Sequence, residues 1–263
     1  MLQDYHVHAL AHGEYQYTYD WLKKFLITAR ERHIVELGFA EHDEFISQID
    51  TTVLERVQEE FPDIKLRLGL EVDYIPGRED YIRQLCQSYD FDYIIGSIHF
   101  IDGWGFDHPD FRHLFEEKDI DQVYSRYFEL VQMAIDSGLF SIMGHLDLIK
   151  IWGYRPNQYD LLFHVKQLLN SIKDSGMVIE INSAGLRKPV GEIYPQQEII
   201  NLMASKQIAV TLGSDAHHPW QVGEGLQEAQ GVLINAGFTY LASLQQRQVR
   251  MQSLNKDLKE NVK

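Results

Sequence analysis

Two histidines near the start of the chain, His6 and His8, are spaced as two ligands of one metal ion would be. They lie in a short run, DYHVH, that alternates in the manner of a β-strand. In an extended strand, residues i and i+2 point to the same face and lie about 6–7 Å apart, at a rise of ~3.3 Å per residue. Asp215 and His217 repeat this spacing far away in the sequence. Both pairs are therefore candidate metal ligands.

Between these two pairs, other strand-like segments each end in a histidine or an acid. In chain order the strand ends carry His6 and His8, His42, Glu71, His99, His145, and Asp215 with His217. One histidine after one strand is usually an ordinary polar residue, but six of seven consecutive strands ending in this way is not expected by chance. Imidazole and carboxylate are the ligands that Zn²⁺, Mn²⁺ and Fe²⁺ prefer.

The number of donors predicts more than one metal ion. Eight donors, or nine if His12 reaches the cluster from the loop after the first strand, exceed what one ion can bind. We therefore expect two or three divalent ions (Zn, Mn or Fe), with Glu71 available as a bridge. Ions ~3.5–4 Å apart are suited to the hydrolysis of phosphate esters.

Seven strands alternating with helices must position these donors. Strands are expected near 4–8, 34–40, 65–71, 93–99, 140–145, 177–182 and 208–213, and helices near 19–32, 51–61, 77–87, 121–137, 159–174, 196–206 and 225–237. This α/β alternation predicts parallel strands, and a distorted TIM-like (β/α)₇ barrel would bring all the strand ends to one face. An open doubly wound sheet is the alternative, but its ligands cluster at one switch point.

The sequence also predicts the structure of two segments outside the strand and helix pattern. The aromatic and glycine-rich segment 101–110 is expected to be a long loop that covers the site, because long loops in compact domains are usually functional or disordered. The polar tail, residues 245–263, is expected to be a frayed helix. We expect residues 1–263 to form one domain.

Composition limits the class of partner. The chain has 263 residues, 44% of them hydrophobic, and a formal net charge of −15. A strongly acidic protein is not expected to bind nucleic acid or an anionic membrane, although a small phosphorylated substrate needs only a local cation. Cys86 is the single cysteine, which excludes an intrachain disulfide. No signal peptide or span of ~20 apolar residues is evident, so a cytoplasmic location is expected.

The ordered motifs resemble those of the PHP (polymerase and histidinol phosphatase) superfamily. The resemblance runs from residue 4 to about 220 and rests on His6-x-His8, Glu41-His42, GLEVD at 69–73, GSIH at 96–99, Gly144-His145 and GSDAH at 213–217. The segments 97–107 and 180–189, with Tyr194-Pro195, are similar to the histidinol-phosphatase branch. This resemblance implies a distorted (β/α)₇ barrel, a trinuclear metal centre and hydrolysis of L-histidinol phosphate to L-histidinol and phosphate in histidine biosynthesis.

The resemblance also implies an assignment of the ligands. The first metal would be held by His6, His8, Glu71 and Asp215, and the second by Glu71, His99 and His145. The third would take His217 and His12, with His42 beside it. In many family members the strand-1 loop supplies its later ligand after a longer spacer, whereas here only Ala9-Leu10-Ala11 precedes His12.

Four residues are candidates for contact with the substrate. A water activated by the metals would attack phosphorus directly, with no phospho-enzyme. Arg187 would bind the phosphate, because guanidinium offers paired donors to its oxygens, with Arg155 as a second candidate. His42 would protonate the leaving alkoxide if it is not a firm ligand, and Trp104 would cover the imidazole of the substrate. A phosphodiesterase, a nucleotide phosphatase and a non-catalytic metal-binding module remain as alternatives.

Overall fold

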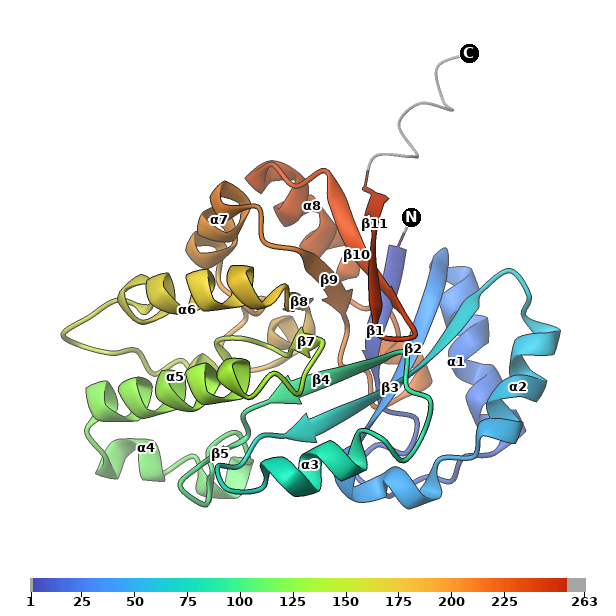
Figure 1. The fold of residues 1–263 in the computed structure, drawn as a ribbon, viewed down its shortest axis with the longest axis horizontal. Coiled ribbons are helices and arrows are strands. Elements are labelled where there is room, and N and C mark those ends of the chain that lie inside the picture. Colours follow the sequence, from blue (N-terminus) through green and yellow to red (C-terminus); the bar gives the residue numbers. More distant parts are fainter. Residues whose placement is uncertain (1, 255–263) are drawn as a thin grey trace, which may run out of the picture.

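Seven parallel strands form the sheet on which the structure is built. The computed structural model describes residues 2–254, and its strand order is β1-β2-β3-β4-β7-β8-β9. The sheet curls until its two edges, β1 and β9, meet. The His8 N–H donates to the Ala216 carbonyl (2.8 Å), and the Ala216 N–H donates to the His6 carbonyl (3.2 Å). Helices surround the strands (Figure 1). The expected (β/α)₇ barrel is therefore confirmed, and the open sheet is excluded.

The elements follow one another as strand and helix, as predicted. The strands of the barrel are β1 (Leu2–Val7), β2 (Ile34–His42), β3 (Lys65–Asp73), β4 (Tyr93–Ser97), β7 (Ile142–Met143), β8 (Val178–Asn182) and β9 (Val210–Gly213). The helices are α1 (Tyr19–Glu31), α2 (Thr51–Glu60), α3 (Glu79–Leu85), α4 (Leu114–Glu117), α5 (Ile120–Ser137), α6 (Leu161–Ser175), α7 (Gln197–Lys206) and α8 (Leu226–Ala236), with five 3₁₀ turns, η1 (Asp43–Gln48), η2 (Pro109–Phe111), η3 (Leu148–Lys150), η4 (Ala184–Arg187) and η5 (Pro219–Gln221).

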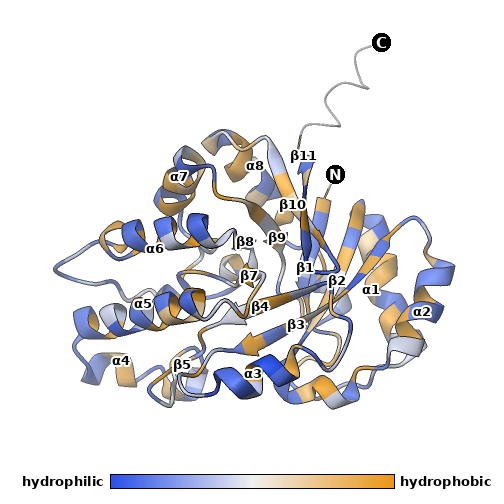
Figure 2. Cartoon of the chain, viewed as in Figure 1, coloured by the Kyte–Doolittle hydropathy of each residue, from blue (hydrophilic) through white to orange (hydrophobic). Residues whose placement is uncertain are grey.

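The helices form where an apolar stripe meets capping residues. In α5, Val123, Tyr127 and Val131 are among the buried residues and follow one another at four-residue spacing. Asp119 caps its N-terminus, and Gly138 ends it in the left-handed conformation. Orange faces of the helices turn toward the strands in Figure 2. The burial of these stripes holds the helices against the barrel.

Asp50 caps the N-terminus of α2, which begins at Thr51. The side chain of Asp50 accepts the N–H groups of Thr52 and Val53. Both threonines lie inside the helix, in its first turn. A carboxylate is also favoured over a hydroxyl at this position by the helix dipole.

The segment after β4 is more regular than expected. Residues 101–110 were predicted to be a long loop, but Phe100–Ile101 (β5) and Trp104–Gly105 (β6) pair as a short antiparallel hairpin before η2. The aromatic side chains Trp104 and Phe106 are buried rather than presented to solvent. This segment is thus a packed part of the fold.

The described part of the chain ends in a hairpin at the base of the barrel. β10 (Tyr240–Gln245) pairs antiparallel with β11 (Gln248–Ser253), and it lies beside β1 and β9 in Figure 1. The prediction of a frayed helix beyond Gln245 is therefore wrong for residues 248–253, and residues 255–263 lie outside the described part. Ala242 and Leu244 fill the barrel interior together with Tyr5 and Tyr93.

Two glycines make room for one large side chain in this interior. A Cβ atom at Gly38 would lie 2.0 Å from the Tyr93 hydroxyl, and one at Gly69 would lie 2.3 Å from its ring. The Tyr93 hydroxyl donates to the carbonyl of Tyr5 across the barrel (2.7 Å). The interior of the barrel around Tyr93 is thus a packed core.

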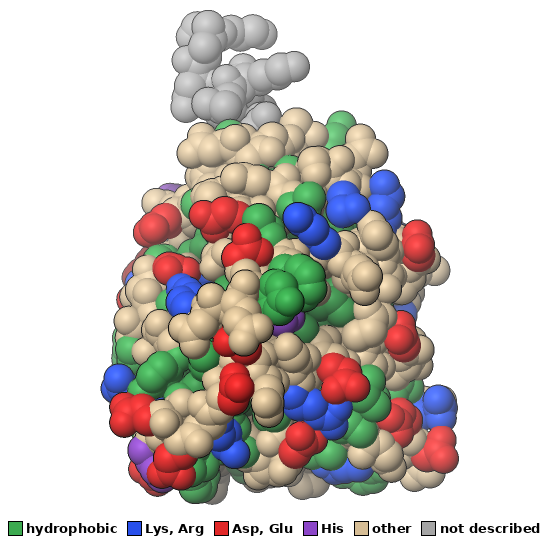
Figure 3. All heavy atoms as spheres, turned by 90° about the vertical axis from the view of Figure 1, so that its left-hand side faces the viewer, with side chains coloured by type: hydrophobic (Ala, Val, Ile, Leu, Met, Phe, Trp, Pro, Cys, Tyr) green, Lys and Arg blue, Asp and Glu red, His purple; other side chains and the backbone are tan. Residues whose placement is uncertain are grey.

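The surface carries charges of both signs. Figure 3 shows acidic and basic side chains interspersed over one face of the molecule. Among residues 2–254, no helix has both the length and the apolar character needed to cross a membrane.

Candidate metal centre

The strands deliver their donors to one end of the barrel. His42 is the last residue of β2 and Glu71 lies near the end of β3, while His99 and His145 follow β4 and β7 within two residues. The remaining donors come from the two edges that meet, at the end of β1 and just after β9. Because parallel strands share one direction, six distant segments meet in this way.

Glu71 is the centre of the cluster. Its carboxylate is buried, and five imidazoles surround it. Measured from the nearest ring nitrogen to a Glu71 oxygen, the distances are 3.3 Å for His6, 3.5 Å for His8, 3.0 Å for His42, 3.7 Å for His99 and 3.1 Å for His145. One carboxylate within reach of five imidazoles is placed as a bridge between ions would be.

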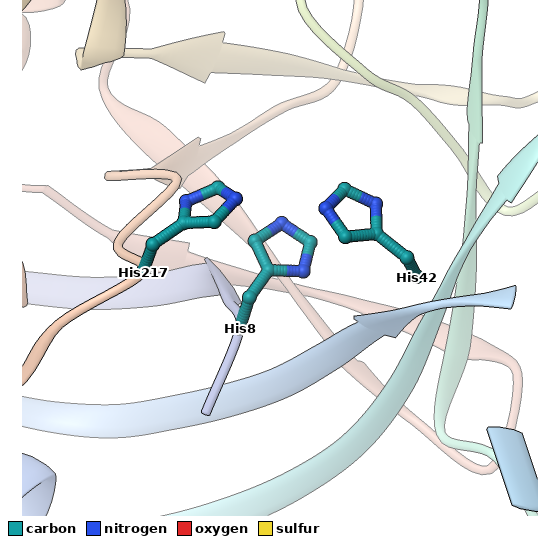
Figure 4. Close-up of side chains that lie close together, drawn as sticks. All are labelled: His8, His42 and His217. Carbon is teal, nitrogen blue, oxygen red and sulfur yellow. The ribbon is translucent and has the colours of Figure 1, made fainter. Parts of the chain in front are cut away.

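Three imidazoles gather on one side of Glu71. Figure 4 shows His8, His42 and His217 converging from three different segments. The ring centroids of His8 and His42 are 4.1 Å apart and nearly parallel, and those of His8 and His217 are 4.5 Å apart. Their nitrogens come close enough together to hold a metal ion.

Asp215 completes the cluster from the opposite edge of the sheet. Its Oδ1 lies 3.5 Å from His8 Nε2 and 4.0 Å from His6 Nε2. Asp215 adopts a positive φ of 54°, a conformation that is uncommon for non-glycine residues. The backbone is therefore held in a less favoured conformation where its carboxylate faces the histidines.

Unsatisfied nitrogens test whether this cluster suits metal ions. Buried polar atoms nearly always have hydrogen-bond partners. Here the buried atoms that have none within residues 2–254 include His6 Nε2, both nitrogens of His8, His42 Nε2, His145 Nδ1 and His217 Nε2. Four triads of donors lie within coordinating reach of one ion: His8–His42–His217, His6–His8–Glu71, His6–His145–Asp215 and Glu71–His99–His145. The residues therefore suit a cluster of metal ions.

The pKa values of His8, His217 and Glu71 agree with this role. Burial lowers the pKa of His8 well below its usual value, and the neighbouring His42 and His217 lower it further. Burial likewise lowers the pKa of His217 to about 4. Burial opposes ionisation of Glu71, but His6 and His99 outweigh it and hold its pKa well below the usual range. A neutral imidazole and an ionised carboxylate are the forms that bind metals. At His6, His42 and His99, burial opposes the charged form, but nearby carboxylates outweigh it and raise the pKa.

Comparison with known proteins identifies the family. The PHP domain family model matches residues 4–184, which is more than half of the chain. The chain belongs to this family. The recognition of the superfamily from its motifs is thereby confirmed.

Individual relatives narrow the comparison. A Deinococcus radiodurans protein named "Probable histidinol-phosphatase" is 40% identical over 181 residues, which cover 68% of this chain and 66% of that protein. The Bacillus subtilis histidinol-phosphatase is 31% identical over 178 residues, covering 61% of this chain and 66% of the relative. The chain thus spans about two thirds of the length of these two curated relatives.

A solved structure shares the fold of nearly the whole chain. It is a histidinol phosphate phosphatase from Lactococcus lactis subsp. lactis complexed with Zn, L-histidinol and phosphate. The two superpose with a TM-score of 0.77 at 20% identity, over 94% of this chain and 98% of that chain. This likeness extends the barrel beyond the matched residues 4–184.

Two acids that are not among the eight donors orient imidazoles of the cluster. Glu180 Oε1 lies 2.6 Å from His6 Nδ1, and Glu180 Oε2 accepts the backbone N–H of His145. Asp73 contacts His99 Nδ1 in the same manner. Such partners fix the tautomer and direction of a metal-binding histidine. The sequence reasoning missed Glu180, whose signal was an acid inside the otherwise apolar strand β8.

His12 lies at the edge of the cluster. Its ring centroid is 4.6 Å from that of His217 and 5.4 Å from that of His42, but the residue is exposed. None of the four donor triads includes it. Its role as a ligand stays a prediction.

A cavity of about 190 Å³ leads to the cluster. His42, His99, His145 and His217 contribute to its wall together with His12, Glu71 and Asp215, and the remaining lining residues are Asp107, His108, Pro109, Leu148, Ile151, Ala184, Lys188 and Tyr194. The sequence analysis did not single out Lys188, although it directly follows Arg187 in the motif after β8. It is the one lysine or arginine in the described wall of this cavity.

Of the four predicted substrate contacts, His42 lines this cavity, whereas Arg187, Arg155 and Trp104 do not. Arg187 donates through Nη2 to the carbonyls of Ser214 (2.7 Å) and Asp215 (3.2 Å), while its buried Nη1 has no partner within residues 2–254. Arg155 donates to Glu192, and Trp104 packs against Phe115. Their contact with substrate stays a prediction, and only Arg187 touches the cluster.

Proposed function

We propose that the protein is a metal-dependent phosphomonoesterase that hydrolyses L-histidinol phosphate to L-histidinol and phosphate. The observation that carries the proposal is the set of eight donors centred on Glu71, whose buried nitrogens include several with no hydrogen-bond partner within residues 2–254. The relatives named as histidinol-phosphatases supply the choice of substrate. The small cavity also suits a monoester better than a polymer.

Two or three divalent ions, Zn, Mn or Fe, are proposed at the cluster. One would be held by His6, His8, Glu71 and Asp215, a second by Glu71, His99 and His145, and a third by His217 with His8 and His42 or His12. When bound, such ions acidify a water for attack on phosphorus and neutralise the phosphoryl oxygens. The neutral state of His8 and His217 prepares the chain for them.

Charged residues of the chain would bind the ester. Lys188 lines the cavity and would pair with the phosphate as a point charge. Arg187 would support it through its unpartnered Nη1 and would hold the Ser214–Asp215 backbone in place. His42 would donate a proton to the leaving alkoxide if it is not a firm ligand.

The wall of the cavity would receive the rest of the substrate. Leu148, Ile151 and Tyr194 form an apolar side on which an imidazole could pack while water is excluded. Asp107, near the mouth, is an acid that could meet the ammonium group. A soluble biosynthetic substrate implies a cytoplasmic enzyme that needs neither nucleic acid nor a membrane as partner.

A substrate panel tests the proposal. The metal-loaded enzyme is assayed with L-histidinol phosphate, a nucleoside monophosphate and a phosphodiester, alongside the Asp215→Asn variant. We expect kcat/KM to be highest for L-histidinol phosphate and to be lost with Asp215→Asn. A higher kcat/KM for the diester or the nucleotide would contradict L-histidinol phosphate as the substrate. If no ester is turned over, the result would support a non-catalytic metal-binding module.

A further inference from the structure

A second cavity lies at the opposite end of the barrel from the metal centre. Its volume is about 1000 Å³, and its wall includes the start of β3, the end of α3, the residues before β4 and the turn between β10 and β11. Parallel strands begin at this end. It is thus separated from the proposed catalytic site by the packed core around Tyr93.

Arg67 is an unsatisfied cation in this wall. Its side chain is only 10% exposed, and it lies on the same inward face of β3 as Glu71, because alternate residues of a strand share a face. Within residues 2–254 its guanidinium makes no hydrogen bond, and its Nε is buried. A guanidinium carries five N–H donors, and leaving them unpaired when buried is costly.

Glu36 is the nearest acid, and it forms an ion pair with Arg67 but no hydrogen bond. Its Oε2 lies 3.6 Å from Arg67 Nε. The Glu36 carboxylate already accepts hydrogen bonds from Tyr5, Ser243, Lys65 and Gln252. The two terminal nitrogens of Arg67 therefore remain available to a group inside the cavity.

Two other arginines, Arg83 and Arg247, line the cavity. Arg83 pairs with Asp80 (2.7 Å), while Arg247 donates through Nε to the Phe91 carbonyl and through Nη2 to the Cys86 carbonyl. Of the two lining acids, Asp92 is already bonded to the N–H groups of Leu68 and Gln246, and Asp90 is exposed. Within residues 2–254, Arg67 is thus the arginine of this wall whose guanidinium makes no hydrogen bond.

We propose that this cavity binds a small oxyanion, a phosphate or carboxylate group, on the guanidinium of Arg67. Planar guanidinium donors match the paired oxygens of such groups. The site is independent of the proposed hydrolase activity and lies outside the metal-binding cluster.

Cys86 supplies a readout at this cavity alone. It is the single cysteine of the chain, is 7% exposed and lines the same wall. The rate of its alkylation by neutral iodoacetamide is measured on the metal-loaded enzyme in chloride, inorganic phosphate or acetate at equal ionic strength. Phosphate should slow alkylation severalfold, and protection by acetate would extend the site to carboxylates.

Variants separate this site from the metal centre. Arg67→Met should abolish the protection, Arg67→Lys should weaken it, and Arg30→Met should retain it, because Arg30 pairs with Asp63 on the exterior. Asp215→Asn should also retain it, so the two proposals can fail separately. Calorimetry should find two phosphate sites in the wild type and one in Arg67→Met. Equal alkylation rates in phosphate and chloride, or a single phosphate site in both proteins, would overturn the proposal.

Discussion

His6 Nδ1 and Glu180 Oε1 lie 2.6 Å apart inside the barrel, with both side chains shielded from solvent. The opposite nitrogen of the same ring faces Glu71, at 3.3 Å from Oε1. Gly213 leaves room for this pair, because a Cβ atom at this position would lie 2.0 Å from Glu180 Oε1. Glu180 therefore directs the free nitrogen of His6 into the cluster.

Replacing Glu180 should weaken metal binding without unfolding the chain. Glu180→Gln keeps the shape but removes the charge that orients His6, so we expect metal affinity to fall roughly 10–100-fold. Competition with a chelator measures the affinity. Glu129→Gln, which alters an exposed glutamate on α5, is the matched control. Equal affinities in Glu180→Gln and wild type would show that Glu180 has no such role.

Lys188→Met should impair substrate binding and leave the metals in place. A hydrogen bond to a charged group contributes about 1.5–3 kcal/mol, so kcat/KM for L-histidinol phosphate should fall about 10- to 150-fold. Steady-state kinetics and metal analysis on the same samples check this. Lys173→Met, an exposed lysine of α6, should behave as wild type. A loss of metal together with activity would assign Lys188 a structural role instead.

Arg187→Ala distinguishes two roles for one arginine. If Arg187 binds phosphate, KM should rise far more than metal content falls. If it acts only by holding the Ser214 and Asp215 carbonyls, metal affinity should fall first and KM should follow. Kinetics measured at saturating metal separate the two cases, and unchanged kinetics would reject both.

Glu36 should make stability depend on acid pH. Burial opposes its ionisation, but hydrogen bonds from Tyr5, Gln252, Ser243 and Lys65 lower its pKa from 4.5 to about 2. A lowered folded-state pKa gives stability that is present above the unfolded value and is lost as pH falls toward the folded value. The shift corresponds to roughly 3 kcal/mol.

Urea unfolding of wild type and Glu36→Gln between pH 7 and pH 2 checks this. The wild type should be the more stable protein at pH 7, and the gap in the free energy of unfolding should narrow as pH falls from about 5 to about 2. A gap that is constant with pH would mean that the charge of Glu36 does not stabilise the fold.

The sequence predicted the barrel and its ligand-bearing ends because both follow from local periodicity. Strand alternation fixes which side chains share a face, and parallel strands bring distant ends together. His6, His99 and Asp215 could therefore be grouped from their positions alone. The motifs then identified the family, which the match over residues 4–184 confirms.

What the sequence did not predict depends on tertiary packing or on unusual turns. The β10–β11 turn uses Gln246 and Arg247, both at positive φ (49° and 62°), where asparagine and glycine are the usual signal. Trp104 was expected at the site, but its ring packs against that of Phe115 in the interior. Lys188 and Asp107 meet at the cavity only because two separate loops fold toward each other.

Reconstitution of the metal-free enzyme tests the central claim most directly. All metal is removed with a chelator, and turnover of L-histidinol phosphate is followed as divalent ions are added back. Activity should be absent at the start and reach a plateau at two or three equivalents per chain, and Asp215→Asn should not recover. Full turnover by the metal-free chain would contradict the account.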